Sequence, residues 1–154
     1  MGFEIRAEPF GTPLTQGMAD AQQAELTERH HGSPGSGAMP SPEYFQPPDG
    51  TFLVAFEDGE AIACGGVGRL DGTTGELRRM YVVPAHRGKG LGRAILEHLE
   101  DAARRLGYTR MRLETGNEAP EALGLYTSSG YEPIPCWGPF ADDPKSRCFE
   151  KALY

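Results

Sequence analysis

Hydrophobic and polar residues alternate in the first part of the chain, the pattern of β-strands whose successive side chains point to opposite faces. Phe3–Ala7 alternates in this way and is followed by Pro9, which predicts a short strand that ends there. Asp20 is a candidate N-cap for a helix that runs to about His31. Apolar stretches joined by Asp-Gly turns then predict an antiparallel meander of three strands, at 51–56, 61–67 and 76–83.

The spacing of apolar residues changes to a helical period of about 3.6 after this meander. Gly107 is placed to end the helix, and a strand at 111–115 follows it. We expect this strand to run parallel to 76–83, because a helix connects the two in a right-handed crossover. A short helix at 120–129 and strands at 131–134 and 146–152 complete the chain. The apolar face of the longer helix is made by Leu91, Ala94, Ile95, His98, Leu99, Ala102 and Leu106.

This order of elements predicts an α+β (mixed α/β) fold with a mostly antiparallel central sheet and flanking helices. A chain of 154 residues favours a single domain, 1–154. Residues 32–50 contain four Gly, five Pro and three Ser, which exclude a regular strand or long helix there. A long loop inside a domain is typical of a lid or binding loop, and Tyr44 and Phe45 could anchor it or touch a ligand.

The net charge of −7 argues against general nucleic-acid binding, because affinity for phosphate backbones comes mainly from Lys and Arg. The window 78–112 nevertheless has nine basic and three acidic residues, which favours a polyanion held locally or simply solvated charged faces. Three cysteines that form no Cys-x-x-Cys pair, and four histidines without ligand spacing, predict neither a disulfide framework nor a metal site. We expect no metal and no membrane association. The absence of a signal peptide and of a long apolar run makes a cytoplasmic protein the simplest interpretation.

The segment 87–92, Arg-Gly-Lys-Gly-Leu-Gly, joins a strand to the start of a helix. Glycines there allow the backbone to approach a ligand, and the free N–H groups of the first helical turn favour an anion such as a pyrophosphate. The Walker A motif does not fit, because no Ser or Thr follows Lys89. The dinucleotide fingerprint Gly-x-Gly-x-x-Gly does not fit either, because its third glycine would fall at Arg93 or Ile95. The pattern Arg/Gln-x-x-Gly-x-Gly/Ala fits fully.

That pattern, together with Tyr126-Thr-Ser-Ser-Gly-Tyr131, resembles the acyl-CoA-binding motif of the GNAT N-acetyltransferase superfamily over roughly residues 51–152. The resemblance implies a GNAT-like sheet with one splayed, parallel strand pair. It implies that backbone amides of the glycine segment hold the CoA pyrophosphate and that the end of strand 76–83 pairs with the pantetheine arm. It also implies that Asn117, shortly after strand 111–115, contacts the cofactor arm or orients nearby backbone. The cofactor-binding residues are then Val82, Val83, Arg87, Gly88, Lys89, Gly90, Leu91, Gly92, Arg93 and Asn117.

The resemblance further implies that Tyr126 is the general acid for the departing thiolate and that Glu76 deprotonates the acceptor amine, directly or through water. Each role has a structural alternative: Tyr126 as a core aromatic, Glu76 as a solvent-facing strand residue, Asn117 as a helix cap. Transfer chemistry independently requires such groups, because an ammonium must lose a proton and a thiolate benefits from gaining one.

The function implied is N-acetyl transfer from acetyl-CoA to a primary amine of a small molecule or peptide, in a ternary complex. The alternatives are a non-catalytic acyl-CoA sensor of the same fold and a structural α+β domain. A homodimer is expected only from the resemblance to the family. The acceptor is expected near the loop 32–50, and the acidic balance outside the basic window weakly favours a cationic amine.

Overall fold

The computed structural model describes residues 2–29, 41–116 and 120–154. Seven strands form one sheet in the order β1-β2-β3-β4-β5-β7-β6, and every neighbouring pair is antiparallel except β4 and β5. This arrangement confirms the predicted α+β fold and its parallel pair. The strands are β1 (Glu4–Ala7), β2 (Thr51–Glu57), β3 (Glu60–Asp71), β4 (Thr74–Val82), β5 (Arg110–Gly116), β6 (Glu132–Ile134) and β7 (Ser146–Ala152). The helices are α1 (Pro13–Arg29), α2 (Leu91–Arg105) and α3 (Pro120–Ser128).

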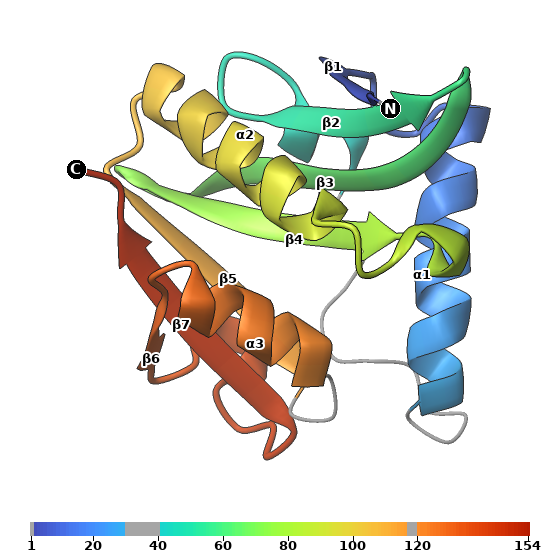
Figure 1. Cartoon of the computed structure of the whole chain (residues 1–154). Coiled ribbons are helices and arrows are strands. Elements are labelled where there is room, and N and C mark those ends of the chain that lie inside the picture. The colour runs from blue at the N-terminus through green and yellow to red at the C-terminus, as the bar shows by residue number, and fades with distance from the viewer. Residues whose placement is uncertain (1, 30–40, 117–119) are drawn as a thin grey trace.

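The helices divide between the two halves of the sheet (Figure 1). α2 lies across β2, β3 and β4, and α3 lies beside β5 and β7 on the same side of the sheet. β4 and β5 start close together and diverge, and α1 stands at the open end of the resulting wedge. This topology leaves the middle of the sheet open toward α1.

The predicted start of α1 at Asp20 is wrong, because the helix begins at Pro13. Thr12 precedes it, and its Oγ1 accepts a hydrogen bond of 3.3 Å from the amide of Thr15. The Oγ1 of Thr15 in turn accepts a hydrogen bond of 2.9 Å from the amide of Gly11. Two threonines and a proline at the first helical position therefore cap the helix, and Asp20 lies within it.

The buried face of α2 differs from the predicted one at His98, which is exposed. Leu96 and Glu100 are buried instead. Glu100 is only 5% exposed and is neutralised by Lys151, whose Nζ lies 3.0 Å from its Oε1. The hydroxyl of Tyr131 also donates to Glu100, at 2.9 Å. A carboxylate can be buried at this position because β7 and the segment before β6 supply both partners.

The segment 41–50 packs against the sheet through a short 3-10 helix, Pro42–Phe45. Phe45 is buried and contacts the rings of Phe10 and Phe52 at 5.0 and 5.3 Å between centroids. A Cβ at Gly68 would lie 2.4 Å from the ring of Tyr44, so only glycine fits beneath it. Both aromatic residues therefore anchor this part of the loop. The remainder of the predicted lid, 32–40, lies outside the described residues.

The expectation that no cysteines pair is wrong, because Cys136 and Cys148 form a disulfide. Cys148 lies on β7 opposite Ile134 of β6, and Cys136 follows two residues later. The hairpin brings the two Cα atoms to 5.2 Å, within the range that a disulfide requires. Cys64 is free and buried. Within residues 2–29, 41–116 and 120–154, no group of three His, Cys, Asp or Glu is arranged to hold a metal, and no helix is long and apolar enough to cross a membrane.

Candidate active site

The site lies where β4 and β5 separate. The two strands pair only at Thr74–Arg110, Gly75–Met111 and Glu76–Arg112, after which β4 continues to Val82 without a partner on that side. A bulge accompanies the separation, because two residues of β4, Arg79 and Met80, lie opposite the single residue Gly65 of β3. Bulges increase the local twist of a strand, which turns the end of β4 away from β5.

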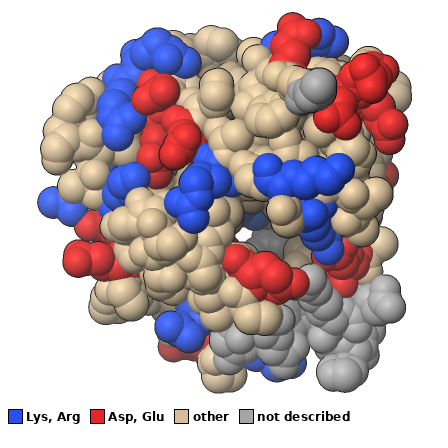
Figure 2. Space-filling model, in the orientation of Figure 1, with Lys and Arg blue, Asp and Glu red and all other residues tan. Residues whose placement is uncertain are grey.

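A cavity of about 830 Å³ fills this wedge, with walls from α1, β4, the start of α2, β5 and α3. The space-filling view shows a hollow near the centre of the same face, edged by both basic and acidic residues (Figure 2). Lysine and arginine side chains are spread over this face rather than gathered in one patch. Several have carboxylate partners: Arg87 binds Glu25, and Arg110 and Arg112 bind Glu150. These carboxylates partly neutralise the three arginines.

The glycine segment forms one wall of the cavity and has the geometry of an anion cradle. Gly88 and Gly90 adopt φ values of 80° and 84°, in the left-handed region that favours glycine. Gly90 is the N-cap of α2, no side chain caps the helix, and its first turn carries no acidic residue. The amides of the first turn have no intrahelical acceptor, so they and the helix dipole are available to an anion.

The end of β4 presents backbone groups to the opening. The amide of Val83 donates to the carbonyl of Ile62 at 3.0 Å and therefore faces β3. In an antiparallel ladder the polar groups of successive residues face opposite sides, so those of Val82 face the wedge. The carbonyl of Val82 accepts a hydrogen bond of 2.9 Å from Nε of Arg87. The cavity is lined by seven of the predicted cofactor residues: Val82, Arg87, Gly88, Gly90, Leu91, Gly92 and Arg93.

Two predicted cofactor residues are absent from this wall, and a third is not described. Val83 and Lys89 do not line the cavity, and Asn117 lies outside the described residues. Two of the lining residues also have structural partners. Nη2 of Arg87 lies 2.8 and 3.0 Å from the carboxylate oxygens of Glu25 on α1, and Arg93 donates to serine hydroxyls at the end of α3, at Ser128 and Ser129. These contacts join the cradle to the two helices beside it.

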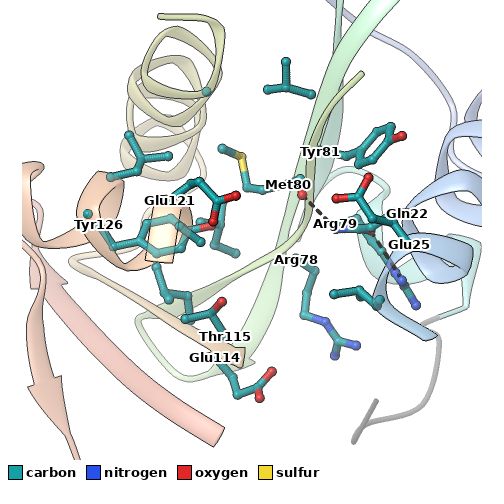
Figure 3. Close-up of a pocket in the computed structure, with 18 of the residues that line it drawn as sticks. Gln22, Glu25, Arg78, Arg79, Met80, Tyr81, Glu114, Thr115, Glu121 and Tyr126 are labelled. Atoms are coloured by element: carbon teal, nitrogen blue, oxygen red, sulfur yellow. Dashed lines mark hydrogen bonds between the residues drawn. The ribbon is translucent and has the colours of Figure 1, made fainter. Parts of the chain in front are cut away.

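Tyr126 lies on α3, across the cavity from α1 (Figure 3). It is only 6% exposed, and its ring packs edge-on against Tyr131 at 5.9 Å. Its hydroxyl makes no hydrogen bond to another described residue. Burial raises the pKa of this phenol well above its ordinary value, so it keeps its proton at neutral pH. The residue is thus a core aromatic and a wall of the cavity at once.

Glu76 lines the cavity at the last paired position of β4. It is 5% exposed, so the solvent-facing alternative is wrong. Its Oε1 accepts a hydrogen bond of 2.5 Å from the hydroxyl of Tyr44, and its Oε2 lies 3.7 Å from Nη1 of Arg78. Burial, and then the contact with Glu76, raise the pKa of the Tyr44 phenol, which therefore stays protonated and donates. The loop 41–50 thus reaches the site through one side chain.

Sequence reasoning missed Glu114 on β5, which Figure 3 shows in the cavity near Arg78. The hydroxyl of Ser146 donates to Oε2 of Glu114 at 2.7 Å. Burial raises the pKa of Glu114 above its ordinary value, although Ser146 and Arg78 oppose the shift. Strand periodicity could have found it. Arg112 pairs with Glu76, and Glu114 lies two residues beyond Arg112, on the same face of the sheet as Arg112.

Comparison with known proteins identifies the fold. A model of the Acetyltransferase (GNAT) family matches residues 15–131. The chain belongs to this family. This acetyltransferase is 39% identical over 107 residues to the IAA acetyltransferase of Azospirillum brasilense, which covers 69% of the chain and 70% of the relative. It is 34% identical over 113 residues to the uncharacterized N-acetyltransferase YsnE of Bacillus subtilis, with 72% and 75% covered.

Solved structures agree with this assignment. A Klebsiella pneumoniae protein proposed to be an acyl-CoA N-acyltransferase is similar to this acetyltransferase with a TM-score of 0.83 and 29% identity, over 99% of this chain and 98% of that one. The PaiA N-acetyltransferase of Thermoplasma acidophilum, solved in complex with coenzyme A, has a TM-score of 0.72 at 18% identity, over 99% of each chain. The second likeness shows the fold alone.

Proposed function

We propose that this acetyltransferase transfers an acetyl group from acetyl-CoA to a primary amine of a small molecule or peptide, directly within a ternary complex. The observation that carries the proposal is the wedge between β4 and β5. It has an anion cradle on one wall and places a protonated phenol and a carboxylate on two others. Relatives named N-acetyltransferases and solved structures that contain coenzyme A or acetyl-CoA support the same chemistry.

The described residues fit acetyl-CoA, which supplies the acetyl group as a thioester. The amides from Gly88 to Arg93 would hold the pyrophosphate, and the outward-facing backbone groups of Val82 would pair with the pantetheine arm. The cradle has room for this approach, since a Cβ added at Gly88 or Gly90 would meet no atom within 4 Å.

Two side chains would then move the protons. The carboxylate of Glu76 takes a proton from the acceptor ammonium, directly or through water, and frees the lone pair that forms the N–C bond. The hydroxyl of Tyr126 gives its proton to the sulfur as the C–S bond breaks. The attacking nitrogen loses a second proton as it becomes an amide, and this proton returns through water to the Tyr126 oxygen. The proton on Glu76 passes to solvent, so the products are the acetamide, the thiol of coenzyme A and one released proton.

Direct transfer is favoured over an acyl-enzyme because no described cysteine is a competent nucleophile. Cys136 and Cys148 are bonded to each other. Burial raises the pKa of Cys64 to about 12, which suppresses its thiolate at neutral pH.

The test is a screen of a primary-amine library with acetyl-CoA, in which thiol release is followed by a colour reagent and the products by mass spectrometry. We expect amine-dependent thiol release with a product heavier by one acetyl group. Binding of acetyl-CoA without transfer to any amine would contradict the proposal.

A further inference from the structure

Arg79 is held in a backbone conformation that a long side chain rarely adopts. Its φ is 62°, in the left-handed region, where a residue other than glycine is strained. The bulge that imposes this conformation makes Arg78 and Arg79 consecutive residues of the same cavity wall. Strain of this kind concentrates at functional sites.

The charge of Arg79 is poorly compensated by the described residues. Its Nε is buried and has no hydrogen-bond partner among them. Nη1 lies 3.4 Å from Oε1 of Gln22 on α1, and the amide group of Gln22 is oriented by a second hydrogen bond of 2.7 Å to the carbonyl of Met80 (Figure 3). Gln22 is neutral, and no ion pair joins Arg79 to a carboxylate in the described part of the chain.

Burial lowers the pKa of Arg79, and repulsion from Arg78 lowers it further. A partly desolvated guanidinium beside a second cation is costly unless an anion pairs with it. Guanidinium groups match carboxylates in particular, through paired N–H donors.

The same cavity holds the opposite charge a short distance away. Glu76 and Glu114 line it, and Glu76 precedes Arg79 by three residues on β4, about 10 Å of strand. Side chains at the two positions can therefore contact an amine and a carboxylate on one small molecule.

We propose that the acceptor is an amino acid, whose carboxylate binds Arg79 while its amine lies toward Glu76. This inference rests on the proposed function, which it makes specific. The cofactor phosphates are the other anions near this site, but their cradle is the start of α2, whereas Arg79 faces Gln22 of α1.

The experiment measures kcat/KM for amino acids, each beside its own carboxamide, which keeps the amine and removes the negative charge. We expect the wild-type enzyme to prefer the acid about 10- to 100-fold, the range of one hydrogen-bonded charge. In Arg79→Gln the preference should fall toward one, chiefly through the KM of the acid. Arg79→Lys, which keeps the charge but loses the paired donors, should be intermediate.

Arg105→Gln is the matched control, because Arg105 is an exposed residue of α2 outside this cavity and its loss changes the net charge equally. Thermal unfolding and acetyl-CoA affinity establish that each variant folds and binds cofactor. Equal rates with acid and carboxamide in the wild-type enzyme would overturn the amino-acid inference and leave amine acetylation standing. A rise in the KM of acetyl-CoA in Arg79→Gln would assign the charge to the cofactor instead. Failure to acetylate any amine would overturn the proposed function, and this inference with it.

Discussion

Tyr126→Phe removes one oxygen atom from the wall of the cavity and leaves the packing in place. The hydroxyl has no hydrogen-bond partner among the described residues, so its loss leaves none of their polar groups unpaired. The ring contact with Tyr131 at 5.9 Å is retained. We therefore expect the free energy of unfolding to change by less than about 0.5 kcal/mol.

The expected loss is in turnover. A positioned general acid contributes about 100- to 10,000-fold, and the lower figure corresponds to about 2.7 kcal/mol of barrier. A thiol has a reference pKa of about 8.5, so its thiolate requires a proton at pH 7 and departs unaided at higher pH. The loss in kcat should therefore be about 100-fold at pH 7 and smaller at pH 9.5, while the KM of acetyl-CoA changes little.

Tyr131→Phe provides the matched control, because it removes the same atom from the neighbouring ring. The hydroxyl of Tyr131 donates to the buried carboxylate of Glu100 at 2.9 Å, and loss of a hydrogen bond to a charged group costs about 1.5–3 kcal/mol. The two variants should thus show opposite effects, with Tyr126→Phe slow and stable and Tyr131→Phe active and destabilised. Steady-state thiol release and urea denaturation measure the two quantities on the same samples.

Two results would refute this reasoning. A kcat for Tyr126→Phe within twofold of the wild-type value at pH 7 would remove the residue from its role as acid. A loss of stability in Tyr126→Phe equal to that in Tyr131→Phe would show that its hydroxyl has a structural partner.

Three further predictions concern the cradle, the second carboxylate and the disulfide. Gly90→Leu should raise the KM of acetyl-CoA strongly, whereas Gly107→Leu should not. Both glycines have positive φ and open space at Cβ, so both variants lose about 1–2 kcal/mol of stability and only the first blocks the cradle; equal KM values would contradict it. Glu114→Gln should raise the thermal midpoint at pH 8 and less so at pH 4. The pKa of Glu114 is raised in the folded state, which therefore favours the protonated form. Ionisation of Glu114 thus destabilises the folded protein at pH values above the ordinary glutamate pKa. This destabilisation is lost as the pH falls through the raised pKa. A midpoint difference that grows toward acid pH would contradict this sign. Cys136→Ser should lower the free energy of unfolding by up to about 3 kcal/mol in denaturant without reductant, because the disulfide closes a short loop. The substitution should have no such effect when dithiothreitol is present. If dithiothreitol left the denaturation midpoint of the wild-type protein unchanged, the two thiols would not be bonded.

The sheet and α2 could be predicted from sequence because their signals are local. A two-residue Asp-Gly turn joins β2 to β3, Gly72 lies in the turn between β3 and β4, and an apolar period identifies α2. The start of α1 was missed because its apolar stripe is weak, so the position of the cap rested on one residue, Asp20. The burial of Glu100 depends on Lys151, 51 residues away, and no local pattern distinguishes it from a surface acid. The disulfide likewise required knowledge that β6 and β7 form a hairpin.

The proposed cofactor side and the proposed acceptor side of the active site also differ in how far local sequence can predict them. The proposed cofactor cradle is built from backbone amides and positive-φ glycines of one six-residue segment, and a backbone geometry of this kind tolerates few sequences. The proposed acceptor side is built from side chains that β4, β5, α1 and the segment before β7 bring together, at positions from Gln22 to Ser146. Any one of these side chains can change without disturbing the cradle. One fold can therefore keep its acetyl donor while its acceptor changes, and we propose that individual charges such as that of Arg79 determine which acceptor binds.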